Sequence, residues 1–102
     1  MKESIIQRRL MDAITKEFPD IYMRKIAQTM YSHGGVPDIV GCLNGLWFSV
    51  EVKTDTGVLS KLQVREGKLI EQAGGLFLVC YGGRDIEYIV SVLRSTTLSA
   101  SA

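Results

Sequence analysis

The chain has few of the residues that mark secreted, metal-thiolate or membrane proteins. Its 102 residues include two cysteines, two prolines, one histidine and one tryptophan. Neither Cys42 nor Cys80 has the spacing of a metal-ligand pair, and each lies in an apolar run where a reduced cysteine acts as a small hydrophobic residue. No apolar run approaches the roughly 20 residues that a membrane-spanning helix needs. No signal-like segment opens the sequence, so we expect no structural disulfide and a cytoplasmic location.

Charge of one sign is also scarce. Twelve lysines and arginines against eleven acids leave a net charge of +1, and 46% of the residues are hydrophobic. This balance describes an ordinary globular protein and permits a nucleic-acid partner without demanding one. The length predicts one domain, which we place at residues 1–94, followed by a small, polar and flexible tail at residues 95–102.

Two strand-like runs, Val36–Leu43 and Leu46–Lys53, are joined by an Asn-Gly dipeptide at positions 44 and 45. This dipeptide is typical of the two-residue type I′ hairpin turn, and the turn fixes the register of the strands. Counting outward from the turn, Asp38 faces Glu51 directly. Like charges in such a pair are destabilising, so folding alone gives no reason for them.

A divalent cation would offset this repulsion, because Mg²⁺ prefers carboxylate and water oxygens. The carbonyl of Val52 is a candidate third ligand, and strand alternation puts Lys53 on the side of Glu51. The structural alternative is that both carboxylates face solvent, or that Asp38 caps a turn while Glu51 pairs with Lys53. The predicted register favours the metal interpretation.

Residues 3–18 predict an amphipathic helix that ends before Pro19. Glu3 falls within the apolar stripe of this helix. An inward-facing glutamate needs a partner, and a metal or a metal-bound water would serve. A glutamate in the first turn can also favour the helix dipole and remain hydrated, so the pattern leaves both interpretations open. The apolar stripe consists of Ile6, Leu10, Ile14 and Phe18.

The second predicted helix begins after Ser60 and ends before the Gly-Gly pair at positions 74 and 75. Ser60 and Gln63 fit a capping box, which gives Gln63 a structural role. One face of this helix carries Lys61, Arg65 and Lys68, which either track a phosphate backbone or form a solvated surface. Another face is predicted to be apolar, although Glu66 falls on it, and consists of Leu62, Leu69, Ile70 and Ala73. The other predicted elements are strands at residues 21–29 and 76–81, the latter buried on both faces, and a final helix at 85–93 capped by Asp85.

The loop predicted at residues 30–35 contains two aromatic side chains, those of Tyr31 and His33. Tyr31 is a candidate for stacking on a nucleobase or for a dimer contact. His33 tempts an assignment as a base or a ligand, but a lone histidine is more often a surface loop residue.

The Pro-Asp at positions 37 and 38, followed by Glu51-x-Lys53, resembles the PD-(D/E)XK nuclease superfamily. The sequence pattern GGVPD…EVK…LSKLQ is similar to that of its VRR-NUC branch, a group of small virus-type nucleases. The resemblance runs from residue 3 to about residue 81. It implies an α/β, restriction-endonuclease-like fold with a central mixed sheet flanked by helices in the order α-β-β-β-α-β-α.

The resemblance also implies a metal-dependent endodeoxyribonuclease that cleaves DNA phosphodiesters with Mg²⁺, for which Mn²⁺ substitutes. In this branch Asp38 and Glu51 would be metal ligands, joined by Glu3 from the first helix. Lys53 would be the catalytic lysine, and Gln63 would be directed at the active site.

A chain of this length resembles the stand-alone virus-type, phage-like members of the branch, which act in a host cytoplasm as homodimers on branched DNA, including Holliday junctions. The nucleic-acid contacts would come from Tyr31, Lys61, Arg65 and Lys68. One alternative is a nickase or exonuclease acting on ends, flaps or single strands. An alternative of another class is a non-catalytic DNA-binding subunit.

Overall fold

The computed structural model describes residues 1–27 and 33–101, with side chains described as far as residue 96. Four strands form one mixed sheet in the order β1-β2-β3-β4. Strand β2 pairs antiparallel with both β1 and β3, whereas β4 pairs parallel with β3. The elements are α1 (Glu3–Glu17), β1 (Tyr22–Lys25), β2 (Ile39–Leu43), β3 (Leu46–Lys53), α2 (Lys61–Gln72), β4 (Leu76–Tyr81), the 3-10 turn η1 (Gly83–Asp85) and α3 (Ile86–Ser101).

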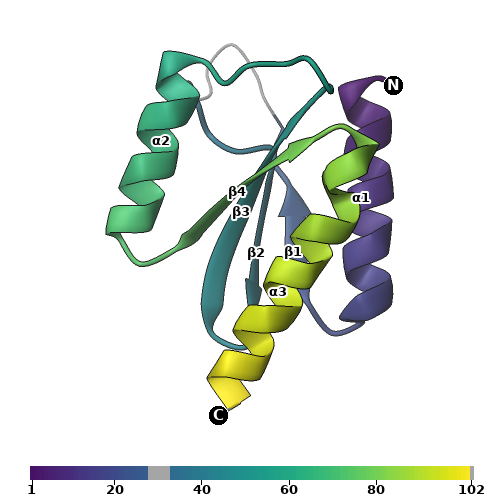
Figure 1. Cartoon of the computed structure of the whole chain (residues 1–102). Coiled ribbons are helices and arrows are strands. Elements are labelled where there is room, and N and C mark those ends of the chain that lie inside the picture. The colour runs from purple at the N-terminus through teal and green to yellow at the C-terminus, as the bar shows by residue number, and fades with distance from the viewer. Residues whose placement is uncertain (28–32, 102) are drawn as a thin grey trace.

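Helices α1 and α3 lie together on one side of the sheet and α2 lies on the other (Figure 1). This arrangement confirms the predicted α/β fold, in which a mixed sheet is flanked by helices in the order α-β-β-β-α-β-α. No helix in the described part of the chain is both long enough and apolar enough to cross a bilayer.

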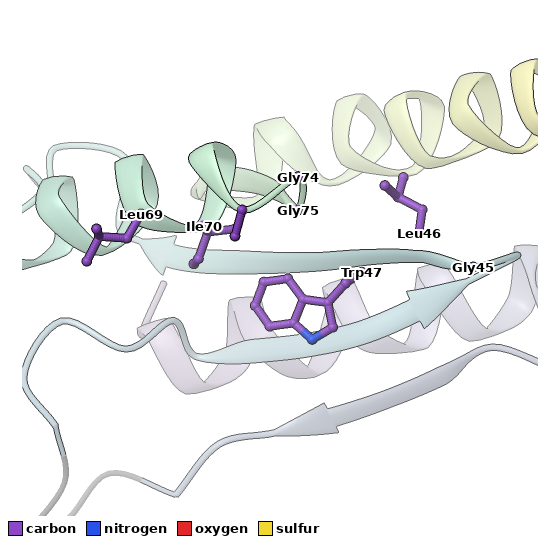
Figure 2. A pocket seen from close by; sticks show the side chains of 8 residues that line it. Gly45, Leu46, Trp47, Leu69, Ile70, Gly74 and Gly75 are labelled. Atoms are coloured by element: carbon purple, nitrogen blue, oxygen red, sulfur yellow. The ribbon is translucent and has the colours of Figure 1, made fainter.

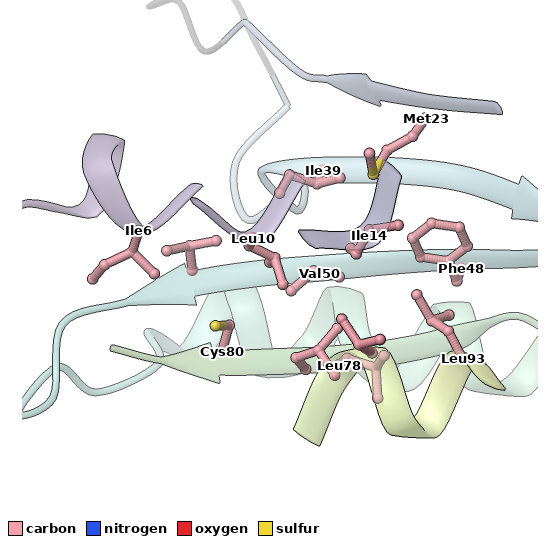
Figure 3. Packing of buried hydrophobic residues seen from close by; sticks show 13 residues of the cluster. Ile6, Leu10, Ile14, Met23, Ile39, Phe48, Val50, Leu78, Cys80 and Leu93 are labelled. Atoms are coloured by element: carbon pink, nitrogen blue, oxygen red, sulfur yellow. The ribbon is translucent and has the colours of Figure 1, made fainter. Parts of the chain in front are cut away.

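The core fills the space between the sheet and the α1–α3 pair (Figure 3). Alternate residues of β3 point into it, as the strand pattern predicts. An ion pair between Arg94 Nε and Glu17 Oε1, at 2.5 Å, joins the two helices at the outer edge. The fully buried side chains of this core include Ile6, Leu10, Ile14, Phe48, Val50, Val52, Ile89 and Leu93.

The hairpin forms with the predicted register. Asn44 and Gly45 have φ values of 51° and 84°, the two positive values that a type I′ turn requires. Leu43 then pairs with Leu46, and the pairing continues outward to Ile39 and Val50. Strand β3 has the predicted bounds, so the turn dipeptide sets which side chains of β3 share each face of the sheet.

Several predicted boundaries are wrong. Strand β2 begins at Ile39 and not at Val36, because Pro37 has no N–H for a ladder hydrogen bond. Strand β1 ends at Lys25, four residues before its predicted end, which itself lies outside the described residues. Strand β4 lies at an edge of the sheet and is only partly buried on its α2 side, so it is not buried on both faces. Helix α3 continues to Ser101 and includes most of the segment predicted as a tail.

Helix α2 approaches the sheet at a glycine. A Cβ atom at Gly67 would lie 2.6 Å from the ring of Phe77, so only glycine permits this close crossing. The leucines of the predicted apolar face are not covered as expected, because Leu62 is 52% exposed and Leu69 is 48% exposed. Much of α2 is therefore open to solvent, which matters for the surface beside the site.

Candidate active site

The structure brings two carboxyl groups together where β2 and β3 begin to separate. Asp38 immediately precedes β2, and Glu51 lies near the end of β3. The β2–β3 ladder ends at the pair of Ile39 and Val50, and Asp38 and Glu51 are the next residues beyond it. Oδ2 of Asp38 accepts a hydrogen bond of 2.8 Å from the backbone N–H of Val52, which fixes the carboxylate beside its neighbour.

Glu51 has an unfavourable environment for a carboxylate. Its side chain points to the α2 side of the sheet, and the residue is only 3% exposed. Burial raises its pKa from 4.5 to about 8, with further increases from a hydrogen bond to Asp38 and from the negative charges of Asp38 and Glu3. The positive charge of Lys53 acts in the opposite direction and lowers the pKa.

The two carboxylate oxygens of Glu51 differ in their hydrogen-bond partners. Oε1 accepts a hydrogen bond of 3.1 Å from Nε2 of Gln63. Oε2 is buried and, in the ionised form, has no hydrogen-bond partner among the described residues. A buried, unpaired carboxylate oxygen beside a second acid carries a desolvation penalty that a divalent cation would relieve. The donor set of Asp38 and Glu51 thus fits a hard, oxygen-preferring ion such as Mg²⁺.

Gln63 forms the predicted capping box and also contacts the carboxylate pair, while its predicted role toward the attacking water or a phosphate oxygen stays a prediction. Its backbone N–H donates to Oγ of Ser60 at 3.2 Å, and its Oε1 accepts from the backbone N–H of Ser60 at 2.8 Å. The capping box is therefore complete. The amide nitrogen at the other end of the same side chain donates to Glu51. The start of α2 and the carboxylate pair are thereby held together by one residue.

Lys53 lies half-buried two residues beyond Glu51 on the same strand. The turn that follows packs against its stem, since a Cβ atom at Gly57 would lie 3.0 Å from Cβ of Lys53. Lys53 is close enough to lower the pKa of Glu51. Its positive charge is thus available beside the two acids.

Glu3 is placed less closely than its predicted role requires. It begins α1 and is exposed, although its charge still raises the pKa of Glu51. Among residues 1–27 and 33–101, no group of three or more His, Cys, Asp or Glu side chains is arranged to hold one ion. The assignments of Glu3 and of the Val52 carbonyl as metal ligands therefore stay predictions.

Three of the four residues predicted to contact nucleic acid lie in the described part of the chain. Lys61, Arg65 and Lys68 line a shallow groove of about 330 Å³ on the outer side of α2. This placement puts the three cations on the helix whose first turn carries Gln63. Tyr31 lies outside the described residues.

A contact between His33 and Glu66 was missed from the sequence. Nε2 of His33 lies 2.7 Å from Oε1 of Glu66. The loop comes this close because Gly35 has a φ of +86° and a Cβ atom there would lie 2.5 Å from the carbonyl oxygen of Leu62. The only sequence signal was an acid on the otherwise apolar side of the α2 helical wheel. The pair ties the loop before Asp38 to α2.

The sheet order, the flanking helices and the carboxylate pair beside the β2–β3 hairpin together define a restriction-endonuclease-like α/β fold. A solved structure described as a "VRR_NUC domain" matches 84% of this chain and 95% of its own length, with a TM-score of 0.65 and 20% sequence identity. No protein-family model and no curated protein matches the chain in sequence. At this identity the likeness is one of fold, and it supports the resemblance to VRR-NUC domains predicted from the sequence motifs.

Proposed function

We propose that the protein is a metal-dependent nuclease that hydrolyses phosphodiester bonds of DNA. The observation that carries the proposal is the pairing of buried Glu51 with half-buried Asp38, in which Oε2 of ionised Glu51 has no partner among the described residues and the pKa of Glu51 is raised to about 8. Such a pair destabilises the fold, whereas in a cation-dependent hydrolase it binds the metal ion. The likeness in fold to a VRR_NUC domain supports the same conclusion.

In this proposal Asp38 and Glu51 hold Mg²⁺ or Mn²⁺, with Glu3 and the Val52 carbonyl as further ligands. When bound, the ion supplies an acidified water and positive charge against the reacting phosphate. Lys53 adds a fixed positive charge where negative charge grows on the phosphate oxygens during hydrolysis. Gln63 keeps the Glu51 carboxylate oriented through its Nε2 hydrogen bond.

Branched DNA is the proposed substrate, with the Holliday junction as the preferred form and a homodimer as the active assembly. One chain contributes a single carboxylate pair, and paired symmetric incisions require two sites related by a twofold axis. The cations of α2 offer contacts to the phosphate backbone that do not depend on sequence, and Tyr31 remains a candidate for a base contact.

The test is incubation of the purified protein with labelled four-way junction, duplex and single-stranded DNA, in Mg²⁺ and separately in EDTA. We expect cleavage in Mg²⁺, strongest on the junction, and none in EDTA. Glu51→Gln, which keeps the shape and removes the charge, should abolish cleavage. Binding of all these DNAs without cleavage in either Mg²⁺ or Mn²⁺ would instead identify a non-catalytic DNA-binding subunit.

A further inference from the structure

The α2 side of the sheet continues beyond the carboxylate pair to an exposed aromatic side chain. Trp47, the single tryptophan of the chain, is 42% exposed. Strand alternation puts Trp47 and Glu51 on the same face of β3, about 13 Å apart along the strand. That spacing corresponds to roughly four steps of stacked bases at a rise of 3.4 Å each. A nucleic-acid strand that follows β3 away from the site would therefore pass near Trp47.

Trp47 lies in an open apolar groove of about 520 Å³ between the hairpin and the C-terminal half of α2. Figure 2 shows the indole beside β3, with Leu69 and Ile70 on the helix above it. The groove depends on Gly75, because a Cβ atom there would lie 2.8 Å from Cε3 of the indole. A flat aromatic wall that is accessible from solvent can accept another flat ring.

A second aromatic side chain extends this surface across the sheet. Trp47 pairs with Cys42, and Cys42 pairs with Tyr22, so the three side chains form one row on the same face. Tyr22 is 57% exposed. The guanidinium of Arg24 lies 4.5 Å from the centre of the Tyr22 ring, which brings a positive charge to the far end of the row.

The positive charge beside the groove favours a negatively charged ligand. Leu69 belongs both to this groove and to the neighbouring one, which is lined by Lys61, Arg65 and Lys68. No acid lines either groove among the described residues, and Glu66 instead faces His33. A second copy docked here about a twofold axis would bring its own three cations toward these three, which is unfavourable. A ligand that carries flat rings and negative charge suits both surfaces.

We infer that the Trp47 groove is a subsite for an unpaired nucleobase, which stacks on the indole while the cations of α2 hold the adjoining phosphates. The inference rests on the proposed function, because it takes DNA as the substrate. Within that substrate it requires a single-stranded or opened segment, such as opened base pairs at the centre of a junction, about four nucleotides from the cleaved bond. Stacking on aromatic side chains accepts any base, so no sequence preference follows.

The intrinsic fluorescence of Trp47 tests the subsite directly, and EDTA prevents cleavage during the measurement. Titration with single-stranded DNA, or with duplex carrying a single-stranded tail, should quench the emission. A duplex whose ends are closed by loops without bases offers no unpaired base and should quench the Trp47 emission little.

The affinity of Trp47 variants for labelled oligonucleotides, measured by fluorescence anisotropy, is the second test. Trp47→Leu should weaken binding of single strands about tenfold, whereas Trp47→Phe should stay within about threefold of the wild type. Tyr88→Leu, at an exposed position on α3, is the matched control and should leave binding unchanged.

Two results would overturn the inference. One is unquenched emission with every DNA together with wild-type affinity in folded Trp47→Leu protein. The other is emission that depends on protein concentration without DNA, with Trp47→Leu turning a dimer into a monomer, which would make the groove a subunit interface. The proposed function is judged separately from cleavage in Mg²⁺: quenching without any cleavage would keep the subsite and refute the nuclease.

Discussion

The backbone N–H of Val52 donates a 2.8 Å hydrogen bond to the side chain of Asp38 and not to another strand's backbone. The pairing of β2 with β3 ends at Ile39, so this N–H meets a carboxylate where the ladder has stopped. The bond fixes Asp38 beside buried Glu51 at no cost to the regular part of the sheet. The site therefore arises where the hairpin ends, and its acids are positioned by the hairpin register.

The pH dependence of stability reports the state of Glu51. Its pKa is about 8 in the folded protein and 4.5 in its ordinary state, so between these values the folded chain holds a proton that the unfolded chain releases. The free energy of unfolding without metal should therefore fall by up to a few kcal/mol as the pH rises from about 4.5 to about 8. Denaturant unfolding in EDTA across this range measures it. Glu51→Gln should remove most of the dependence, and an equally steep dependence in that variant would contradict the assignment.

The two functions of Gln63 can be separated by substitution. Ser60→Ala removes only the hydroxyl that caps α2, so it should cost about 1 kcal/mol of stability and leave cleavage near the wild-type rate. Gln63→Ala keeps the bond from its backbone N–H to Ser60 but removes the side-chain acceptor of the Ser60 N–H and the contact with Glu51, so it should cost a similar amount and also lower the cleavage rate. Thermal unfolding and single-turnover cleavage of both variants make the comparison. Equal cleavage rates for the two variants would leave Gln63 with only its capping role.

Lys53 is expected to act on the reaction more than on binding. Lys53→Ala should retain DNA affinity within a few-fold, because a single phosphate contact is a small share of a basic surface. It should lose cleavage by 100-fold or more, a loss on the order of that for removing one group that stabilises transition-state charge. Gel-shift binding in EDTA and cleavage in Mg²⁺ give the two values. Cleavage at an undiminished rate would refute the assignment.

The contact between His33 and Glu66 is structural in this account. The side chain of His33 is 74% exposed, so solvent screens the pair and it contributes at most about 1 kcal/mol. Glu66→Gln should therefore lower the melting temperature only slightly. Melting curves of the variant and the wild type check this. A large loss of cleavage in Glu66→Gln would instead assign the pair a part in holding the active site.

Local signals made much of the fold predictable. The Asn-Gly turn gives the β2–β3 register, and the Ser60–Gln63 spacing gives the start of α2, because both depend on neighbouring residues. The pair between His33 and Glu66 could not be predicted from the sequence, because its partners are 33 residues apart and meet only through the packing of the loop on α2. Gln63 illustrates another limit: the sequence posed capping and a place beside the acids as alternatives, whereas the two ends of its amide bond Ser60 and Glu51 at once.

The placement of Glu3 shows why the candidate site was only partly predictable. Helical periodicity put it on the apolar stripe of α1, but the first turn of a helix extends beyond the core and can stay hydrated. The exposed leucines of α2 have a similar cause. Periodicity identifies an apolar face without showing how much of it the sheet covers, and α2 contacts the sheet mainly around Gly67.

Binding of a divalent ion by Asp38 and Glu51 is the central claim, and calorimetric titration of the DNA-free protein with Mn²⁺ tests it most directly. Wild-type protein should bind the ion and release protons at pH 7, because Glu51 must ionise to bind it. Asp38→Asn and Glu51→Gln should each weaken binding tenfold or more, while the exposed-residue control Tyr88→Leu should bind as the wild type does. Equal Mn²⁺ affinity in all four proteins would contradict the account.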